Sequence, residues 1–225
     1  WQEQRSQTGI YRSSGSSEGR TRSNGRNMIE HFDVIQRTDQ WFLLRMGKFT
    51  GTDFQTIANG RAATKETLIY KKAAEILTGH RNENGFFNEQ MERGVETEEE
   101  ARQVFEFETG LTVKECGFVE KDQYSGISPD GLIGDDAGIE IKCKDDHTHL
   151  KCLLSGDNSY KWQLQGSLYV TGRKKWYFVS YNRFFPPEKM LYVEEVYPDE
   201  ESFEKIRIGL REAIQQLETI LKKAA

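Results

Sequence analysis

From Met28 onward, the spacing of apolar residues shifts between the period of a helix and the alternation of a strand. Over residues 65–79, for example, five apolar side chains fall on one side of a helix, and a glycine ends the pattern. The pattern predicts helices over 41–46, 52–59, 65–79, 88–109, 147–155, 160–171 and 202–223. It predicts strands over 112–120, 125–127, 132–133, 139–143, 175–181 and 190–196. This order favours an α/β fold with a central mixed β-sheet flanked by helices.

The first 27 residues lack this pattern. They are rich in serine, glycine and arginine and nearly free of aliphatic side chains, so they cannot bury a core. We predict that residues 1–27 are disordered, as a leader or tag, with a basic nucleic-acid-binding arm as the alternative. No linker or repeat interrupts residues 28–225, which we expect to form a single domain.

Composition narrows the classes of function. No run approaches 18 consecutive apolar residues, so we expect no membrane span. Three cysteines without a CxxC pair predict neither a disulfide framework nor a zinc site, and they favour a cytoplasmic, reducing setting. The formal net charge of −5 argues mildly against binding nucleic acid over a broad surface. A local basic channel inside an acidic exterior is still compatible with that charge.

Four carboxylates precede Lys142 in one short, otherwise apolar stretch. Residues two apart in a strand share a face, so Glu140 and Lys142 point the same way. A glycine-flanked turn containing Asp135 and Asp136 would bring Asp130 back beside Glu140. Two such carboxylates can share a cation, and a neighbouring lysine can orient or deprotonate a water. The alternative is a polar hairpin with a salt bridge.

A further acid stands out on the helix predicted over 88–109. On a helical wheel, Glu98 falls in the middle of the apolar stripe, whereas its acidic neighbours fall outside it. A carboxylate in such a stripe is costly unless it is paired or bound to a metal. Glu98 is therefore either the ion-pair partner of Arg102, one turn further on, or a third metal ligand.

These residues resemble the lambda-exonuclease (YqaJ-type) branch of the metal-dependent PD-(D/E)xK nucleases. The short motif is Pro129-Asp130 followed by Glu140-Ile141-Lys142. Further matching blocks are RT and W within 37–41, LRMG at 44–47, GxxxE at 94–98, FEFxTG at 105–110, SPDGL at 128–132, GIEIKC at 138–143, QxQ at 163–165 and WYF at 176–178. The order and spacing of these blocks are far more specific than the short motif.

The resemblance implies a restriction-endonuclease-like core and a 5′→3′ exonuclease that acts on double-stranded DNA ends with Mg²⁺ or Mn²⁺. Such an enzyme leaves a 3′ overhang for a single-strand annealing protein, in a bacterial or phage-infected cell. The resemblance also implies a homo-oligomer, with a trimeric ring around DNA as one form. The alternatives are a restriction- or repair-type endonuclease on the same scaffold and a catalytically silent module that binds DNA ends.

The resemblance also assigns roles to the acids and the lysine. Glu98, Asp130 and Glu140 match the metal-binding acids, and the carbonyl of Ile141 matches a further ligand. Lys142 matches the catalytic lysine.

A second set of residues matches contacts to a terminal 5′-phosphate. Arg45 matches the arginine that holds this phosphate, a role suited to a guanidinium. The polar residues that match contacts around it are Thr52, Ser128, Gln163 and Gln165. The alternatives are a surface arginine and ordinary polar helix positions for the two glutamines.

Three other residues carry weaker predictions. Met91 is either an apolar wedge at the point of strand separation or part of the core. For His147 and His149, a helix-start or surface role is favoured over metal binding. Three cysteines are too few for the four-cysteine iron–sulfur cluster of related nucleases, so we predict none.

Overall fold

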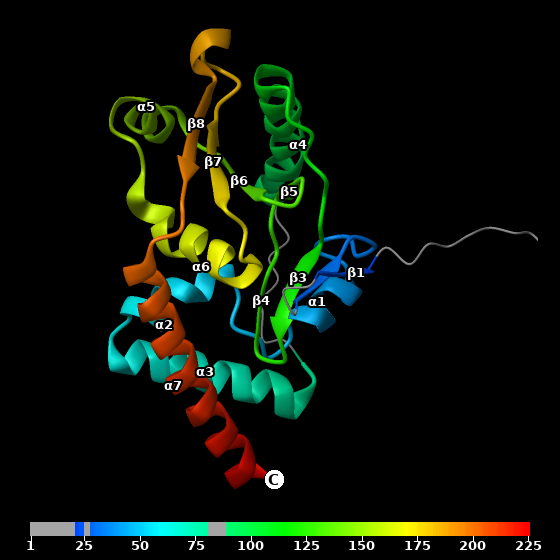
Figure 1. Ribbon diagram of the computed structural model, residues 1–225, viewed down its shortest axis with the longest axis vertical. Helices are drawn as coiled ribbons and strands as arrows, with labels where there is room; N and C mark the ends of the chain where they lie inside the picture. The colour runs from blue at the N-terminus through cyan, green and yellow to red at the C-terminus, as the bar shows by residue number, and fades with distance from the viewer. Residues whose placement is uncertain (1–20, 25–27, 81–88) are drawn as a thin grey trace, which may run out of the picture.

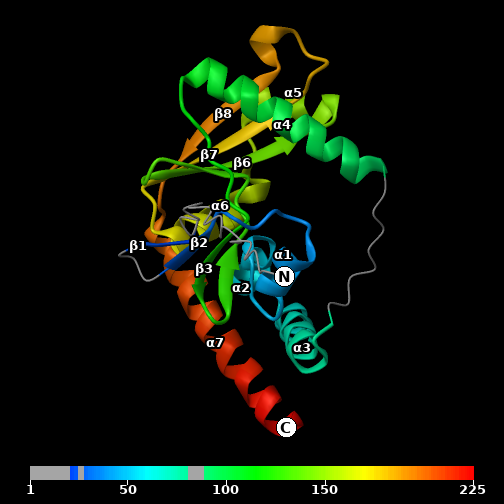
Figure 2. The same ribbon diagram turned by 90° about the vertical axis from the view of Figure 1, so that its right-hand side faces the viewer.

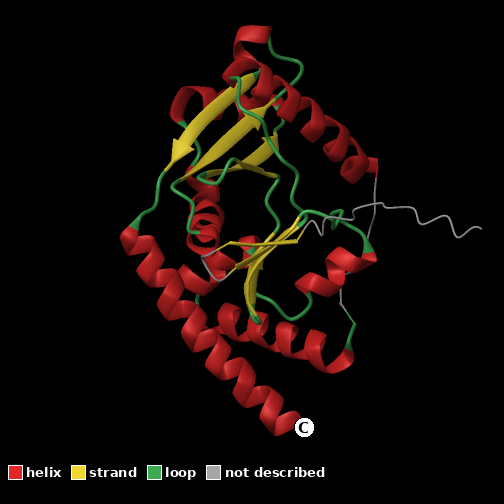
Figure 3. Ribbon diagram, turned by 45° about the vertical axis from the view of Figure 1, so that its right-hand side comes forward, coloured by secondary structure: helices red, strands yellow, loops and turns green. Residues whose placement is uncertain are grey.

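The computed structural model describes residues 21–24, 28–80 and 89–225, and over 21–24 and 89–96 it describes the backbone alone. Met91 therefore lies outside the described side chains. The predicted mixed sheet is present, and a second, antiparallel sheet accompanies it. The two sheets lie one beyond the other along the long axis, with helices around both (Figures 1 and 3). Residues 128–130 link them, so this link lies at their junction.

The mixed sheet has the strand order β5-β6-β7-β8. Its strands are β5 (Gly131–Ile133), β6 (Ala137–Cys143), β7 (Lys175–Tyr181) and β8 (Leu191–Val196). The central strands β6 and β7 run parallel, and each outer strand is antiparallel to its neighbour. Because β7 is buried on both faces after its first residue, its sequence is an almost unbroken run of apolar and aromatic side chains.

Helices cover both faces of the mixed sheet. Helix α4 (Glu89–Thr109) lies on one face, and α5 (Asp146–Ser155) and α6 (Lys161–Thr171) lie on the other (Figure 1). Alternation along β7 places Tyr177 against Phe105 of α4, with ring centroids 5.3 Å apart, while the intervening side chains join the cluster around α6. The two faces of the sheet therefore belong to two separate hydrophobic clusters.

The antiparallel sheet contains β1 (Thr21–Asn24), β2 (Met28–His31), β3 (Phe118–Asp122) and β4 (Ser125–Ile127), in that order. The apolar pattern predicts neither β1 nor β2. It also predicts β3 over 112–120, six residues too early at its start. Residues 21–24 form a strand where disorder is predicted, and the other residues up to 27 lie outside the described residues.

A buried ion pair explains why the apolar pattern does not predict β2. Glu30 in the middle of β2 and Arg173 after α6 approach to 2.8 Å, and both side chains are 1% exposed. The same guanidinium donates to the carbonyls of Gly134 and Ala137 at 2.7 and 2.8 Å. A charged residue thus occupies an interior position, and the pair ties the antiparallel sheet to the hairpin of the mixed sheet.

The remaining helices pack around α6 and the antiparallel sheet (Figure 2). They are α1 (Asp39–Arg45), η1 (Gly51–Asp53), α2 (Phe54–Asn59), α3 (Ala62–Thr78) and α7 (Glu200–Ala224), with short turns η2 (Asn158–Tyr160) and η3 (Pro187–Lys189). Gly166 lets α6 approach α2, because a Cβ there would lie 2.1 Å from the ring of Phe54. Within the described ranges, no helix has both the length and the apolar character needed to cross a membrane.

Candidate active site

The β5–β6 hairpin brings two of the predicted acids together. Gly131 pairs with Ile139 at the open end of the hairpin, so the next residues, Asp130 and Glu140, lie side by side. Asp130 Oδ2 accepts a hydrogen bond of 2.6 Å from the backbone N–H of Ile141. The two other acids of this stretch lie in the exposed turn at the opposite end, as predicted.

Glu140 is the hub of the cluster. Its side chain points to the face of β6 that α6 covers, and the residue is 2% exposed. Its Oε1 accepts hydrogen bonds from the ammonium of Lys142 and, at 2.5 Å, from the amide Nε2 of Gln163 on α6. The ammonium also lies 5.2 Å from the ring centroid of Tyr160. Strand alternation and the crossing of α6 thus place a cation and an amide on one carboxylate oxygen.

Glu98 on α4 interacts electrostatically with this cluster. Its pKa is raised to about 7, first by burial and then by the negative charge of Asp130, although nearby cations partly oppose the rise. The predicted alternative partner, Arg102, instead pairs with Glu115 at 2.5 Å. Three acids from α4, the link between the sheets and β6 therefore influence one another electrostatically.

The pKa values around Glu140 describe a crowded site. Burial and the charge of Asp130 raise the pKa of Glu140, and burial raises that of Asp130. Burial alone would lower the pKa of Lys142, but the carboxylates of Glu140 and Asp130 outweigh it and raise the pKa. Ionising all three acids beside one lysine is thus unfavourable, and an added cation would stabilise their negative charge.

The acid side chains do not converge on one metal-binding position. Across the described ranges, no three His, Cys, Asp or Glu side chains converge closely enough to hold a metal ion. The donor types nevertheless fit a hard divalent cation, which prefers carboxylate and carbonyl oxygens. Both hydrogen bonds to Glu140 fall on its Oε1.

A second cluster forms around Arg45 at the end of α1. Its guanidinium donates to Ser128 Oγ at 2.8 Å and to Thr50 Oγ1 at 3.2 Å, and it lies 4.3 Å from the ring centroid of Trp41. Ser128 Oγ also accepts from the indole N–H of Trp41 at 2.8 Å. Since Ser128 is two residues before Asp130, the two clusters adjoin.

Two predicted contacts are placed elsewhere. Gln165 is buried, and its amide donates to the carbonyl of Tyr197 at 2.8 Å and accepts from the N–H of Asp199 at 2.9 Å, so it anchors the start of α7. Thr52 is exposed in η1, and the hydroxyl that contacts Arg45 belongs to Thr50. The sequence does hold a signal for Thr50, because Thr50-x-x-Asp53 is a capping box that fixes its backbone.

The two histidines lie on α5, at its start as predicted, but they differ in burial. His147 is exposed, whereas His149 is fully buried and hydrogen-bonds to Ser180 Oγ and to the carbonyl of Lys189, both at 2.8 Å. A surface role is therefore wrong for His149, which joins α5 to β7 and η3. Both ring nitrogens are used in this way.

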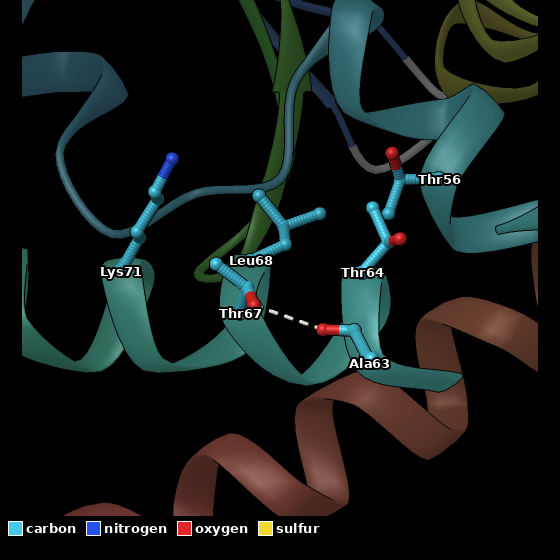
Figure 4. Close-up of a pocket in the computed structure, with 6 residues that line it drawn as sticks. All are labelled: Thr56, Ala63, Thr64, Thr67, Leu68 and Lys71. Atoms are coloured by element: carbon cyan, nitrogen blue, oxygen red, sulfur yellow. Dashed lines mark hydrogen bonds between the residues drawn. The ribbon is translucent and has the colours of Figure 1, made fainter. Parts of the chain in front are cut away.

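A separate hollow of about 400 Å³ opens between α2 and α3 (Figure 4). Hydroxyl groups and one lysine line it: Thr56, Thr64, Thr67 and Lys71, beside Ala63 and Leu68. Thr67 donates to the carbonyl of Ala63 at 2.8 Å. This hollow includes none of the predicted acids.

A family model described as the YqaJ-like viral recombinase domain matches residues 40–174, more than half of the chain. The chain belongs to this family. The range contains both clusters, from Arg45 through Glu98 to Gln163. The predicted resemblance is thereby confirmed.

Solved structures agree with this assignment. The alkaline exonuclease LHK-Exo from Laribacter hongkongensis is 31% identical, with a TM-score of 0.70 over 83% of this chain and 98% of that chain. Its complex with dAMP gives a TM-score of 0.71 at the same identity and coverage. A phage-related exonuclease from Haemophilus somnus 129PT, 15% identical, shares the fold with a TM-score of 0.62 over 79% and 96% of the two chains. None of the curated proteins matches.

These findings confirm the predicted fold class, because the neighbours are restriction-endonuclease-like α/β proteins. They also place this YqaJ-like domain in a nuclease family that acts on DNA.

Proposed function

We propose that this YqaJ-like domain is a metal-dependent exonuclease that degrades the 5′-ended strand of double-stranded DNA and leaves 3′ overhangs. The observation that carries the proposal is the meeting of two clusters at residues 128–130. One holds Asp130, Glu140 and Lys142, and the other holds Arg45 on Ser128. The names of the relatives support it, since LHK-Exo is an alkaline exonuclease and has been solved with dAMP.

The carboxylates fit Mg²⁺ or Mn²⁺ by their chemistry. Glu98, Asp130 and Glu140, with the carbonyl of Ile141, would hold the ion, which makes a bound water more acidic and offsets charge on the leaving oxygen. The raised pKa values of Glu98, Asp130 and Glu140 support this role, because burial leaves their negative charge poorly solvated.

Lys142 and Gln163 prepare the same site for the attacking water. Glu140 Oε1 holds both of their donor groups, so the ammonium is fixed beside Asp130 and Glu140. A cation in that position can orient a water and attract a phosphate oxygen. Lys142 is therefore the residue we assign to activating or orienting the nucleophile, and Gln163 supports its placement.

The Arg45 cluster suits a terminal 5′-phosphate. Ser128 Oγ accepts from both Arg45 and Trp41, so its own O–H can donate to a phosphate oxygen. Arg45 offers a planar, permanently charged fork beside it. A terminal phosphate held here would set the first phosphodiester next to Asp130, so digestion would start at the 5′ end.

Assembly and partners belong to the same proposal. A homo-oligomer, in the form of a trimeric ring, would hold duplex DNA by topology although the chain is net acidic. The overhang it produces would pass to a single-strand annealing protein. Analytical ultracentrifugation with and without duplex DNA tests the oligomer, and a monomer under both conditions would contradict the ring.

The direct test of an end-dependent nuclease compares two forms of one plasmid. Linear and closed circular duplex are incubated with the protein in Mg²⁺ or Mn²⁺. We expect the linear form to be digested and the circle to survive. Equal cutting of both forms would instead indicate the endonuclease alternative, and binding without cutting of either would indicate the silent module.

A further inference from the structure

Arg37 has a backbone conformation that distinguishes it from every other described residue except glycines. Its φ is +68°, and no other non-glycine residue in the described ranges has a positive φ. A side chain disfavours this left-handed region, which glycine adopts without strain. Strained conformations of this kind gather at functional sites, where the surrounding structure holds them in place.

Both neighbours of Arg37 are fixed by hydrogen bonds. Gln36 donates its amide to the carbonyl of Pro129 at 2.8 Å and to the carbonyl of Cys116 at 3.3 Å. Thr38 caps α1, accepting from the N–H of Trp41, and donates to the carbonyl of Ile35 at 2.7 Å. Because Pro129 directly precedes Asp130, the bond from Gln36 holds residue 37 alongside the carboxylate cluster.

The guanidinium of Arg37 is exposed and lies within electrostatic range of the site. Burial raises the pKa of both Glu98 and Asp130, and the charge of Arg37 is among those that partly oppose each rise. Arg102 and Arg173, by contrast, are each paired with an acid. Arg37 forms no ion pair with any residue whose side chain the structure describes.

We propose that Arg37 binds an internal backbone phosphate of the strand being cut and positions the scissile phosphodiester at Asp130 and Glu98. This rests on the proposed nuclease function and adds a second phosphate contact, distinct from the terminal phosphate at Arg45. A guanidinium presents paired donors that match phosphate oxygens. The hydrogen bonds on either side of Arg37 fix its backbone and so limit where its guanidinium can lie. Arg37 would bind this internal phosphate after the Arg45 cluster has captured the 5′ end, and would thereby position the scissile bond.

The test uses the full chain and three variants, R37G, R37Q and R37K. R207Q is the matched control, because Arg207 is an exposed arginine on α7 that pairs with Glu204. Binding to a duplex is measured in chelator at several salt concentrations. Affinity falls as salt rises, and we expect this slope of log affinity against log salt to become less steep by about 0.9 in R37G and R37Q. The slope should stay unchanged in R37K and R207Q.

Digestion in Mg²⁺ gives the second measurement. R37G and R37Q should raise KM about tenfold, while the preference for 5′-phosphorylated ends stays as in the unaltered chain. R37G should also melt at or above the temperature of the unaltered chain, because glycine relieves the strain at this φ. Loss of DNA affinity without loss of stability separates a phosphate contact from a structural role.

Two outcomes would overturn the proposal. One is an unchanged salt slope and KM in both R37G and R37Q. The other is an unchanged slope with a raised Mg²⁺ requirement, which would assign Arg37 to the carboxylates rather than to DNA. If the unaltered chain cuts no DNA, the nuclease function fails, but the binding slope in chelator still tests Arg37 independently.

Discussion

The two halves of the candidate site are built in opposite ways. The carboxylate half stands on a buried strand, and its lysine and glutamine already occupy an oxygen of Glu140. The phosphate half stands on α1 and a loop, where neutral hydroxyls and an indole hold Arg45. The first half needs a cation to complete it, whereas the second presents donors that an anion can meet directly. We therefore expect the carboxylate half to govern chemistry and the phosphate half to govern the choice of end.

Replacing Lys142 with alanine should have the largest effect. Without the ammonium, the water and the phosphate lose their orienting charge, and we expect cleavage to fall by about 10³-fold. DNA-end affinity in chelator should stay within about threefold, because the Arg45 half is untouched. K174A is the control, since Lys174 is an exposed lysine that pairs with Asp136. Cleavage at the normal rate in K142A would mean that the chemistry lies elsewhere.

The carboxylate half should also make metal-free stability depend on pH. The pKa of Glu98 rises from its ordinary value of 4.5 to about 7 through burial and Asp130. The folded protein then binds this proton more tightly than the unfolded one, so the stabilisation is full below pH 4.5 and is lost as pH rises through 7. The loss amounts to at most about 3 kcal/mol.

Urea unfolding in chelator between pH 4.5 and 8 measures this loss. E98Q should make the profile less steep, while Glu140 and Asp130, whose pKa values are also raised, contribute the remaining slope. Mg²⁺ should restore stability at the upper end in the unaltered chain but less in E98Q. The same slope in E98Q and in the unaltered chain would remove Glu98 from the cluster.

Replacing Arg45 with alanine should test the phosphate half. The charge-assisted bonds to a terminal phosphate are worth about 2 kcal/mol, so the preference for 5′-phosphorylated over 5′-hydroxyl ends should fall by about 30-fold. Digestion of 5′-hydroxyl ends should change little. Paired digestion of the two substrates measures the ratio, and an unchanged ratio would place the phosphate pocket elsewhere.

Replacing Ser128 with alanine should give a smaller effect on the same ratio. The change removes one neutral hydroxyl, worth about 1 kcal/mol, and with it the acceptor shared by Arg45 and Trp41. We expect the phosphate preference to fall about fivefold. T52A is the matched control because Thr52 is exposed in η1. A larger loss in T52A than in S128A would reverse our assignment of the two hydroxyls.

The sequence predicted those parts of the site that depend on local periodicity. The two-residue period of a strand and the glycines around the turn suffice to bring Asp130 to Glu140. The apolar stripe of α4 suffices to mark Glu98 as an acid out of place. In both cases the relevant residues are near in sequence or share one helix, so backbone geometry alone relates them.

The parts that were missed depend on long-range contacts. Strand β2 carries Glu30 in an interior position, and only its pairing with Arg173, far along the chain, makes that position stable. Gln165 has the right residue type and spacing for a site contact, but its amide donates instead to the carbonyl of Tyr197, which is distant in sequence. Whether Thr50 or Thr52 contacts Arg45 likewise depends on a long-range contact, because Ser128, which lies far along the chain, helps to fix the position of the guanidinium.

The most direct measurement follows both strands of a linear duplex whose 5′-phosphorylated ends carry one label and whose 3′ ends carry another. In Mg²⁺, we expect early release of the 5′ label as mononucleotide while the 3′ label stays in long fragments, and no release in chelator. Release of the 3′ label first, or digestion that persists in chelator, would contradict a metal-dependent 5′→3′ exonuclease.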